Sequence, residues 1–148
     1  MGLTAREISV EELPEIRAAL NEARLPPAEL TPDVAYYRFV SEDGRTAGFG
    51  GIEGRRADRL LRSVVALPEF RGTGLGAAIV GALERFAAQA GTERLHLLTT
   101  TAAPFFEKLG WEARDRMTAP VGIAVTTEFA TLCPKTARYM VKAVGITR

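Results

Sequence analysis

Cysteine and histidine each occur only once among the 148 residues, which rules out several classes of site within one chain. Because Cys133 is the sole cysteine, no internal disulfide can form, and a reducing, cytoplasmic compartment is expected. One cysteine and one histidine, His96, are too few ligands for a zinc site, so no metal is expected. No apolar run is long enough to cross a bilayer, and the opening MGLTAREISV does not follow the signal-peptide pattern.

The sequence also lacks an excess of either charge, with 19 basic and 18 acidic residues. A protein that binds nucleic acid would carry a basic excess, so neither nucleic acid nor a membrane is expected as a partner. The absence of any Gly-Lys dipeptide excludes a Walker A loop, and none of the serines stands in a Gly-x-Ser-x-Gly hydrolase elbow. The length predicts one domain over residues 1–148, large enough to bury its own core.

Hydrophobic periodicity and turn residues predict a mixed α/β fold in which antiparallel strands come first. Ser9 and Glu12 form a capping-box pattern at the start of a helix, and Asp43-Gly44 is typical of a hairpin. The expected strands are Thr4–Ile8, two within 34–53, Ala57–Leu67, Arg94–Thr100, Trp111–Met117 and Thr136–Val144. The expected helices are 9–23, 75–90 and Ala103–Leu109, with helix or irregular structure over Pro120–Leu132.

A glycine cluster, EFRGTGLGAAIV, lies directly before an apolar run with helical spacing. Glycine suits backbone that turns tightly or approaches a ligand closely, and a helix that begins there directs free N–H groups outward. This arrangement predicts a phosphate-binding loop. The spacing Gly72-x-Gly74-x-x-Ala77 also fits a dinucleotide fingerprint, but the next strand ends in threonines where that fingerprint needs an acidic residue.

The pattern Arg71-x-x-Gly74-x-Gly76, with Pro68 before it and FFEKLGW after the following strand, resembles the GNAT family of acetyltransferases. The resemblance implies a mixed α/β GNAT fold and acetyl-CoA as co-substrate. It implies that loop amides cradle the cofactor's pyrophosphate and that the preceding strand pairs with the pantetheine arm. The residues so implied are Val64, Val65 and Ala66 for the arm, Arg71, Gly72, Thr73, Gly74, Leu75, Gly76 and Ala77 for the pyrophosphate, and Thr99 as a further cofactor contact.

The sequence departs from the family pattern at two positions that handle protons. Phe106 stands where relatives commonly carry a tyrosine acid beside the cofactor, and Leu60 stands where several carry a glutamate base. Two hypotheses therefore stay open: an N-acetyltransferase that acts on a small-molecule amine, and a catalytically weak or inactive acyl-CoA-binding module. Members of the family often dimerise, so the resemblance also implies a homodimer.

Arg62 and Glu53 are the candidate catalytic residues. If the strand is regular from Asp58, then Asp58, Arg62 and Val64 share one face. Arg62 is predicted to bind a carboxylate of the acceptor, and Glu53 to take a proton from its amine. The alternative, that the two pair with each other or with Asp58 at the sheet surface, stays open. His96, in the middle of a strand, is interpreted as a structural or surface residue.

The segments LLTTTA, FFEKLGW and TTEFATLCP resemble the acetyltransferases found in bacterial arsenic-resistance gene clusters. This resemblance implies a role in detoxification and does not identify the acceptor. Direct sensing of arsenite is not expected, because a soft trivalent arsenic ion needs several thiolates and each chain supplies one.

Overall fold

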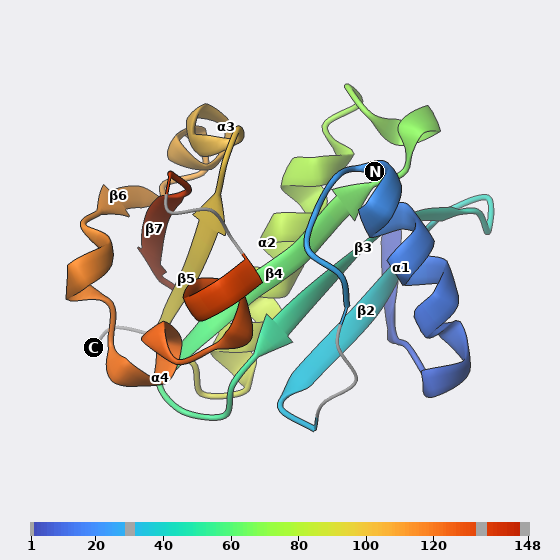
Figure 1. The fold of residues 1–148 in the computed structure, drawn as a ribbon. Coiled ribbons are helices and arrows are strands. Elements are labelled where there is room, and N and C mark those ends of the chain that lie inside the picture. The colour runs from blue at the N-terminus through green and yellow to red at the C-terminus, as the bar shows by residue number, and fades with distance from the viewer. Residues whose placement is uncertain (1, 29–31, 133–135, 146–148) are drawn as a thin grey trace. The chain divides into compact units, whose positions relative to one another are not determined.

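The computed structural model describes residues 2–28, 32–132 and 136–145 (Figure 1). The strands are β1 Leu3–Glu7, β2 Val34–Ser41, β3 Thr46–Glu53, β4 Asp58–Ala66, β5 Arg94–Thr99, β6 Glu112–Arg114 and β7 Arg138–Ala143. The α-helices are α1 Leu13–Glu22, α2 Leu75–Gln89, α3 Ala103–Lys108 and α4 Val121–Ala124. Short 3-10 turns are η1 Val10–Glu12, η2 Pro68–Phe70 and η3 Arg116–Thr118, and η4 Glu128–Leu132 is a π-helical turn.

The strands lie in the order β1-β2-β3-β4-β5-β7-β6. The pairs β1–β2, β2–β3, β5–β7 and β6–β7 are antiparallel, and β4–β5 is parallel. This confirms the predicted mixed α/β class with a mostly antiparallel sheet. The chain divides into two compact units, the first made of Met1–Glu53 and Arg62–Leu83 and the second of Gly54–Leu61 and Glu84–Arg148. That the whole chain is one domain stays a prediction.

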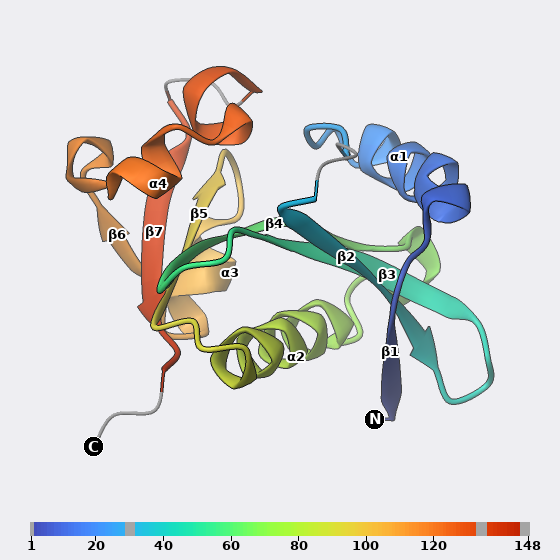
Figure 2. The same ribbon diagram turned by 90° about the horizontal axis from the view of Figure 1, so that it is seen from below.

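In the first unit, α1 and α2 lie on opposite faces of β2 and β3 (Figure 2). Leu13, Ile16 and Leu20 of α1 pack with Tyr36 and Phe49 in one apolar core. Gly48 and Gly50, on either side of Phe49 in β3, have no room for a side chain. A Cβ on Gly48 would lie 2.7 Å from Ile79 Cδ1, and one on Gly50 would collide with Leu83. Glycine in β3 therefore lets α2 approach the strand closely.

In the second unit, β5 pairs with β7 over its whole length, and β6 extends the sheet beyond β7. Leu98 and Tyr139 face Ile123 of α4 and Phe129 of η4 in a second apolar core. The strand predicted over Trp111–Met117 is shorter than expected, because the Asp115 carboxylate accepts a hydrogen bond from the Met117 amide and begins η3. Cys133, the sole cysteine, lies outside the described residues.

Thr92, in the turn between α2 and β5, carries a buried hydroxyl whose effect on stability can be tested. Its side chain is 1% exposed, and its hydroxyl has no hydrogen-bond partner in the described part of the chain. Thr92→Val removes the unsatisfied group at constant shape and is expected to raise the free energy of unfolding by about 1 kcal/mol. Urea unfolding measures this. Thr99→Val is the matched control, because the Thr99 hydroxyl accepts the Ala102 amide and its loss should lower stability. Equal shifts in the two variants would contradict the interpretation.

Candidate active site

The loop between β4 and α2 turns through two glycines in the left-handed region, Gly72 at φ +79° and Gly74 at φ +83°. A Cβ placed on either glycine would meet no described atom within 4 Å, so the space beside the loop is open. The Ala78 amide donates to the Gly74 carbonyl at 3.3 Å, which makes Gly74 the N-cap of α2. The amides of the first helical turn therefore have no intrahelical acceptor.

The loop amides before the helix are also unused. In the described residues no hydrogen bond is recorded from the amides of Gly72, Thr73 or Gly74. Together with Leu75, Gly76 and Ala77 of the first turn, this gives a run of six adjacent residues whose N–H groups have no recorded acceptor among the described residues. The donors lie at the positive end of a 15-residue helix, a combination that favours a phosphate group. The residues present therefore fit the pyrophosphate of the implied cofactor.

Arg71 and Thr73 use their side chains to shape this loop. The Arg71 guanidinium donates to the Ala66 carbonyl at 3.0 Å and to the Glu22 carboxylate of α1 at 2.6 Å. The Thr73 hydroxyl donates to the Phe70 carbonyl. Arg71 is 44% exposed and Glu22 54% exposed in their side chains, so this ion pair is a surface one that a bound phosphate can rearrange.

Strand β4 leads into the loop and is not regular. Ser63 adopts φ +60°, an uncommon conformation for a residue with a side chain, and this interrupts the alternation expected along the strand. Val64 and Ala66 are half-buried and Val65 is buried. The parallel ladder with β5 covers only Asp58–Leu60 of β4, although the strand continues to Ala66.

Arg62 and Glu53 lie together in the first unit. Arg62 Nη1 donates to Glu53 Oε1 at 2.8 Å, and the Arg62 side chain is 0% exposed. The ion pair is therefore buried and does not lie at the sheet surface. Asp58 is not part of it, since its carboxylate binds Arg94 and His96 instead.

Thr99 and Phe106, the predicted cofactor contacts in the second unit, both have structural roles. The Thr99 hydroxyl accepts the Ala102 amide at 3.0 Å, just before α3 begins. Phe106 is 7% exposed and packs edge-to-face on Trp111, with ring centroids 5.6 Å apart. Phe106 is thus a packed apolar residue of the second unit, and its place at the family's tyrosine position stays a prediction from the sequence.

A buried polar chain in the second unit was not predicted. His96 Nε2 lies 2.7 Å from Asp58 Oδ1, and His96 Nδ1 lies 2.7 Å from the Tyr139 hydroxyl. His96 is 2% exposed, so the surface interpretation of this residue is wrong. Because the Asp58 carboxylate only accepts hydrogen bonds, His96 carries its proton on Nε2, and Nδ1 accepts from Tyr139.

The three hydrogen-bonded groups Asp58, His96 and Tyr139 have shifted pKa values. Burial lowers the pKa of His96 against the opposing effect of Asp58, and burial raises the pKa of Tyr139. Burial disfavours the charged form of Asp58, but hydrogen bonds from Arg94 and His96 outweigh it and lower the pKa of its carboxyl.

These shifts predict that acid destabilises the protein through His96. Since its folded-state pKa lies below the ordinary 6.5, the unfolded chain takes up the proton first as pH falls through that value. The free energy of unfolding should therefore fall as pH is lowered below about 6.5, where His96 is the only histidine to titrate. Urea unfolding between pH 7.5 and 5.5 measures this, with His96→Gln as control. An equal pH dependence in the variant would contradict the assignment.

Comparisons with known proteins agree with this geometry. The family model described as an acetyltransferase (GNAT) domain matches residues 34–113, more than half of the chain. The chain therefore belongs to the GNAT acetyltransferase family. None of the curated proteins matches the sequence.

Solved structures share the fold at low sequence identity. One is N-acetylglutamate synthase from Neisseria gonorrhoeae with coenzyme A and N-acetyl-glutamate, with a TM-score of 0.79 and 13% identity over 97% of this chain. This chain spans only 35% of that synthase. The ribosomal-protein-S18-alanine N-acetyltransferase from Escherichia coli has a TM-score of 0.74 and 16% identity, and the match covers 99% of this chain and 97% of that enzyme. Rv2747 from Mycobacterium tuberculosis, in complex with CoA, has a TM-score of 0.73 and 17% identity, and the match covers 95% of this chain and 98% of Rv2747.

Within the described part of the chain, no three histidine, cysteine, aspartate or glutamate side chains lie together as metal ligands would. No helix in the same residues combines the length and hydropathy needed to cross a bilayer.

Proposed function

We propose that this chain transfers the acetyl group of acetyl-CoA to the amine of a small molecule. The observation that carries the proposal is the run of unused amides from Gly72 to Ala77 at the start of α2. These amides would hold the pyrophosphate, with Arg71 beside them. The backbone of Val64, Val65 and Ala66, which continues past the β4–β5 ladder, would pair with the pantetheine arm, and Thr99 and Phe106 would contact the cofactor.

When bound, acetyl-CoA supplies a thioester whose carbonyl carbon an unprotonated amine can attack. The task of the chain is then to hold the amine in place and to remove its proton. Glu53 is the group proposed to do so, since its carboxylate lies 2.8 Å from the Arg62 guanidinium and is 15% exposed. Glu53 and Arg62 together are proposed to serve the acceptor.

The acceptor is proposed to be a small amine. The gonococcal synthase is described with the small molecule N-acetyl-glutamate, which supports this proposal, whereas the Escherichia coli enzyme is named for an alanine of a ribosomal protein. The arsenic-cluster resemblance of the sequence supports a detoxification role for the reaction. A cytoplasmic location and a homodimer stay predictions from the sequence.

Phe106 favours a second candidate function, a module that binds acyl-CoA with little or no turnover. A phenylalanine cannot protonate the departing thiolate, and Phe106 is packed against Trp111. Water can replace an acid of this kind, and positioning of the reactants supplies much of the acceleration, so we give preference to the enzyme.

Two measurements separate the candidates. Calorimetry with CoA tests the cofactor site, and thiol release from acetyl-CoA with a panel of amines tests the reaction. The proposal expects CoA binding together with turnover of at least one amine. CoA binding without turnover of any amine would favour the module, and no CoA binding would contradict both.

A further inference from the structure

The charged side chain of Arg62 is completely buried, which is rare for an arginine. A buried guanidinium must be paired and hydrogen-bonded to be stable there. Nη1 donates to Glu53 Oε1 at 2.8 Å, Nη2 donates to the Pro27 carbonyl at 3.1 Å, and Nε lies 3.4 Å from the Ser63 hydroxyl. Every nitrogen of the guanidinium is therefore directed at a group of the protein itself.

These contacts tie together three separate parts of the first unit. Arg62 comes from β4, Glu53 is the last residue of β3, and Pro27 lies in the segment between α1 and β2. The same segment is held by Arg17, whose Nε donates to the Ala28 carbonyl at 3.2 Å. Arg62 thus fixes Glu53 relative to the chain that follows α1.

Glu53 is the member of the pair that can meet a ligand. Its side chain is 15% exposed whereas that of Arg62 is 0% exposed. Oε1 receives the bond from Arg62, and among the described residues no bond to Oε2 is recorded. One carboxylate oxygen is held, and the other is left to accept a hydrogen bond from an incoming donor.

We infer that Arg62 is a positioning residue and that Glu53 binds the acceptor's ammonium group, so the site selects its acceptor by positive charge and not by a carboxylate. The inference rests on the proposed function. A substrate carboxylate could take the place on Arg62 Nη1 only by displacing Glu53, because Nη2 and Nε are directed at Pro27 and Ser63. This replaces the expectation that Arg62 clamps a carboxylate of the acceptor.

The proton balance of this arrangement is simple. The ammonium gives one proton to Glu53 Oε2, which frees the lone pair on nitrogen. The C–N bond then forms as the C–S bond breaks, and the second proton leaves the nitrogen for the thiolate sulfur. The products are the N-acetyl amine and the CoA thiol, and Glu53 releases its proton to solvent.

The test compares an amino acid with its carboxamide, which keeps the amine and lacks the carboxylate charge. Acceptor affinity is measured by calorimetry with CoA present, where no turnover occurs, and KM and kcat are measured with acetyl-CoA. The variants are the isosteric Glu53→Gln, then Arg62→Met and Arg62→Lys. Arg59→Met is the control from the same strand, because within residues 2–28, 32–132 and 136–145 the recorded bonds of Arg59 are to the carbonyls of Arg55, Arg56 and Ala90.

The inference expects the wild type to bind the carboxamide at least as tightly as the amino acid. Glu53→Gln should weaken both acceptors by about tenfold or more, since a hydrogen bond to a charged group is lost, while the KM for acetyl-CoA stays within about twofold. Arg62→Met should weaken the binding of both acceptors alike and lower kcat, because Glu53 loses the group that holds its Oε1. Arg62→Lys should partly restore the acceptor affinity and kcat, and Arg59→Met should change neither of these quantities.

Two outcomes would overturn the inference. One is a preference of tenfold or more for the amino acid over its carboxamide that disappears in Arg62→Met, which would make Arg62 a carboxylate anchor. The other is unchanged acceptor affinity in Glu53→Gln. If the wild type binds amines without turnover, the proposed function fails, and the measured affinities still decide the role of the pair.

Discussion

Replacing Gly74 by valine is expected to weaken CoA binding by about 100-fold or more while the protein still folds. Gly74 is the N-cap of α2 and lies at the centre of the run of unused amides. A branched side chain there would occupy the open space beside the loop, where the phosphates must approach the backbone. Loss of two hydrogen bonds to a charged group, each worth about 1.5–3 kcal/mol, accounts for this factor. Calorimetry with CoA measures it directly.

The matched control for this prediction is Gly44→Val in the β2–β3 hairpin. Gly44 has φ +86°, nearly the same as the +83° of Gly74, and a Cβ on it also meets no described atom within 4 Å. Both variants therefore force a branched residue into the left-handed region, at a similar expense of about 1–2 kcal/mol in stability. Only Gly74→Val should lose CoA affinity. Equal CoA affinity in the two variants would show that the loop is not the pyrophosphate site.

The parts of the fold that follow from local rules were predictable from the sequence. The Ser9 and Glu12 capping box forms as expected, with the Ser9 amide donating to the Glu12 carboxylate. Gly44 and Gly74 adopt the positive φ that their turn and loop positions require. In each case a residue's own conformational preference, or a partner within four residues, decides the structure.

The parts that depend on strand register could not be predicted. Asp58, His96 and Tyr139 are 38 and 43 residues apart in sequence, and only the pairing of β4, β5 and β7 brings them into one chain of hydrogen bonds. A polar residue in an apolar strand signals that a partner exists, but it does not identify that partner. The left-handed Ser63 gave no signal either, because serine favours no such conformation in a strand.

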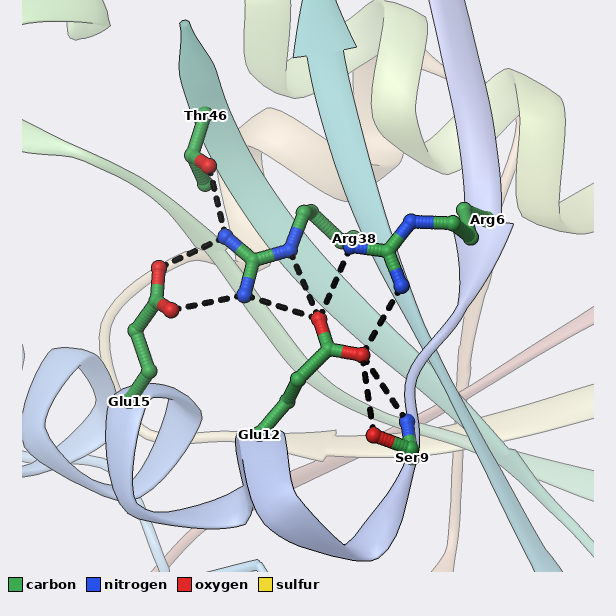
Figure 3. A network of polar contacts seen from close by, with 6 residues as sticks. All are labelled: Arg6, Ser9, Glu12, Glu15, Arg38 and Thr46. Carbon is green, nitrogen blue, oxygen red and sulfur yellow. Dashed lines mark hydrogen bonds and ion pairs between the residues drawn. The ribbon is translucent and has the colours of Figure 1, made fainter.

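The Arg38 network is a further product of register, and it holds α1 against the sheet (Figure 3). Arg38 of β2 binds Glu15 through two nitrogens at 2.6 and 2.7 Å, and its Nε donates to Glu12 at 3.0 Å. Nη1 also donates to Thr46 of β3 at 2.6 Å, and the guanidinium lies 5.2 Å from the centre of the Phe49 ring. The side chains of Arg38 and Glu12 are 9% and 19% exposed, whereas that of Glu15 is 52% exposed, so water screens the Glu15 contact more than the Glu12 contact.

Arg38→Met is therefore expected to destabilise the first unit. Methionine keeps an unbranched apolar stem over Phe49 but leaves Glu12 and Glu15 without their shared cation. Because Glu15 is 52% exposed and Glu12 keeps Arg6 as a partner, the loss in free energy of unfolding is expected to be about 2 kcal/mol, below that of a fully buried pair. Arg38→Lys should recover part of this loss, because lysine keeps the charge but cannot bind Glu15 through two nitrogens.

Urea unfolding of the two Arg38 variants, with Arg114→Met as control, measures the effect. Arg114 pairs with Glu112, and the two side chains are 47% and 62% exposed, so this pair is worth less than about 1 kcal/mol. The same charge change at the surface should thus have little effect on the free energy of unfolding. At Arg38 it removes the hydrogen bonds from β2 to Glu12 and Glu15. A loss in Arg38→Met no larger than that in Arg114→Met would mean that apolar packing of Leu13, Ile16 and Leu20, and not the ion-pair network, holds α1 in place.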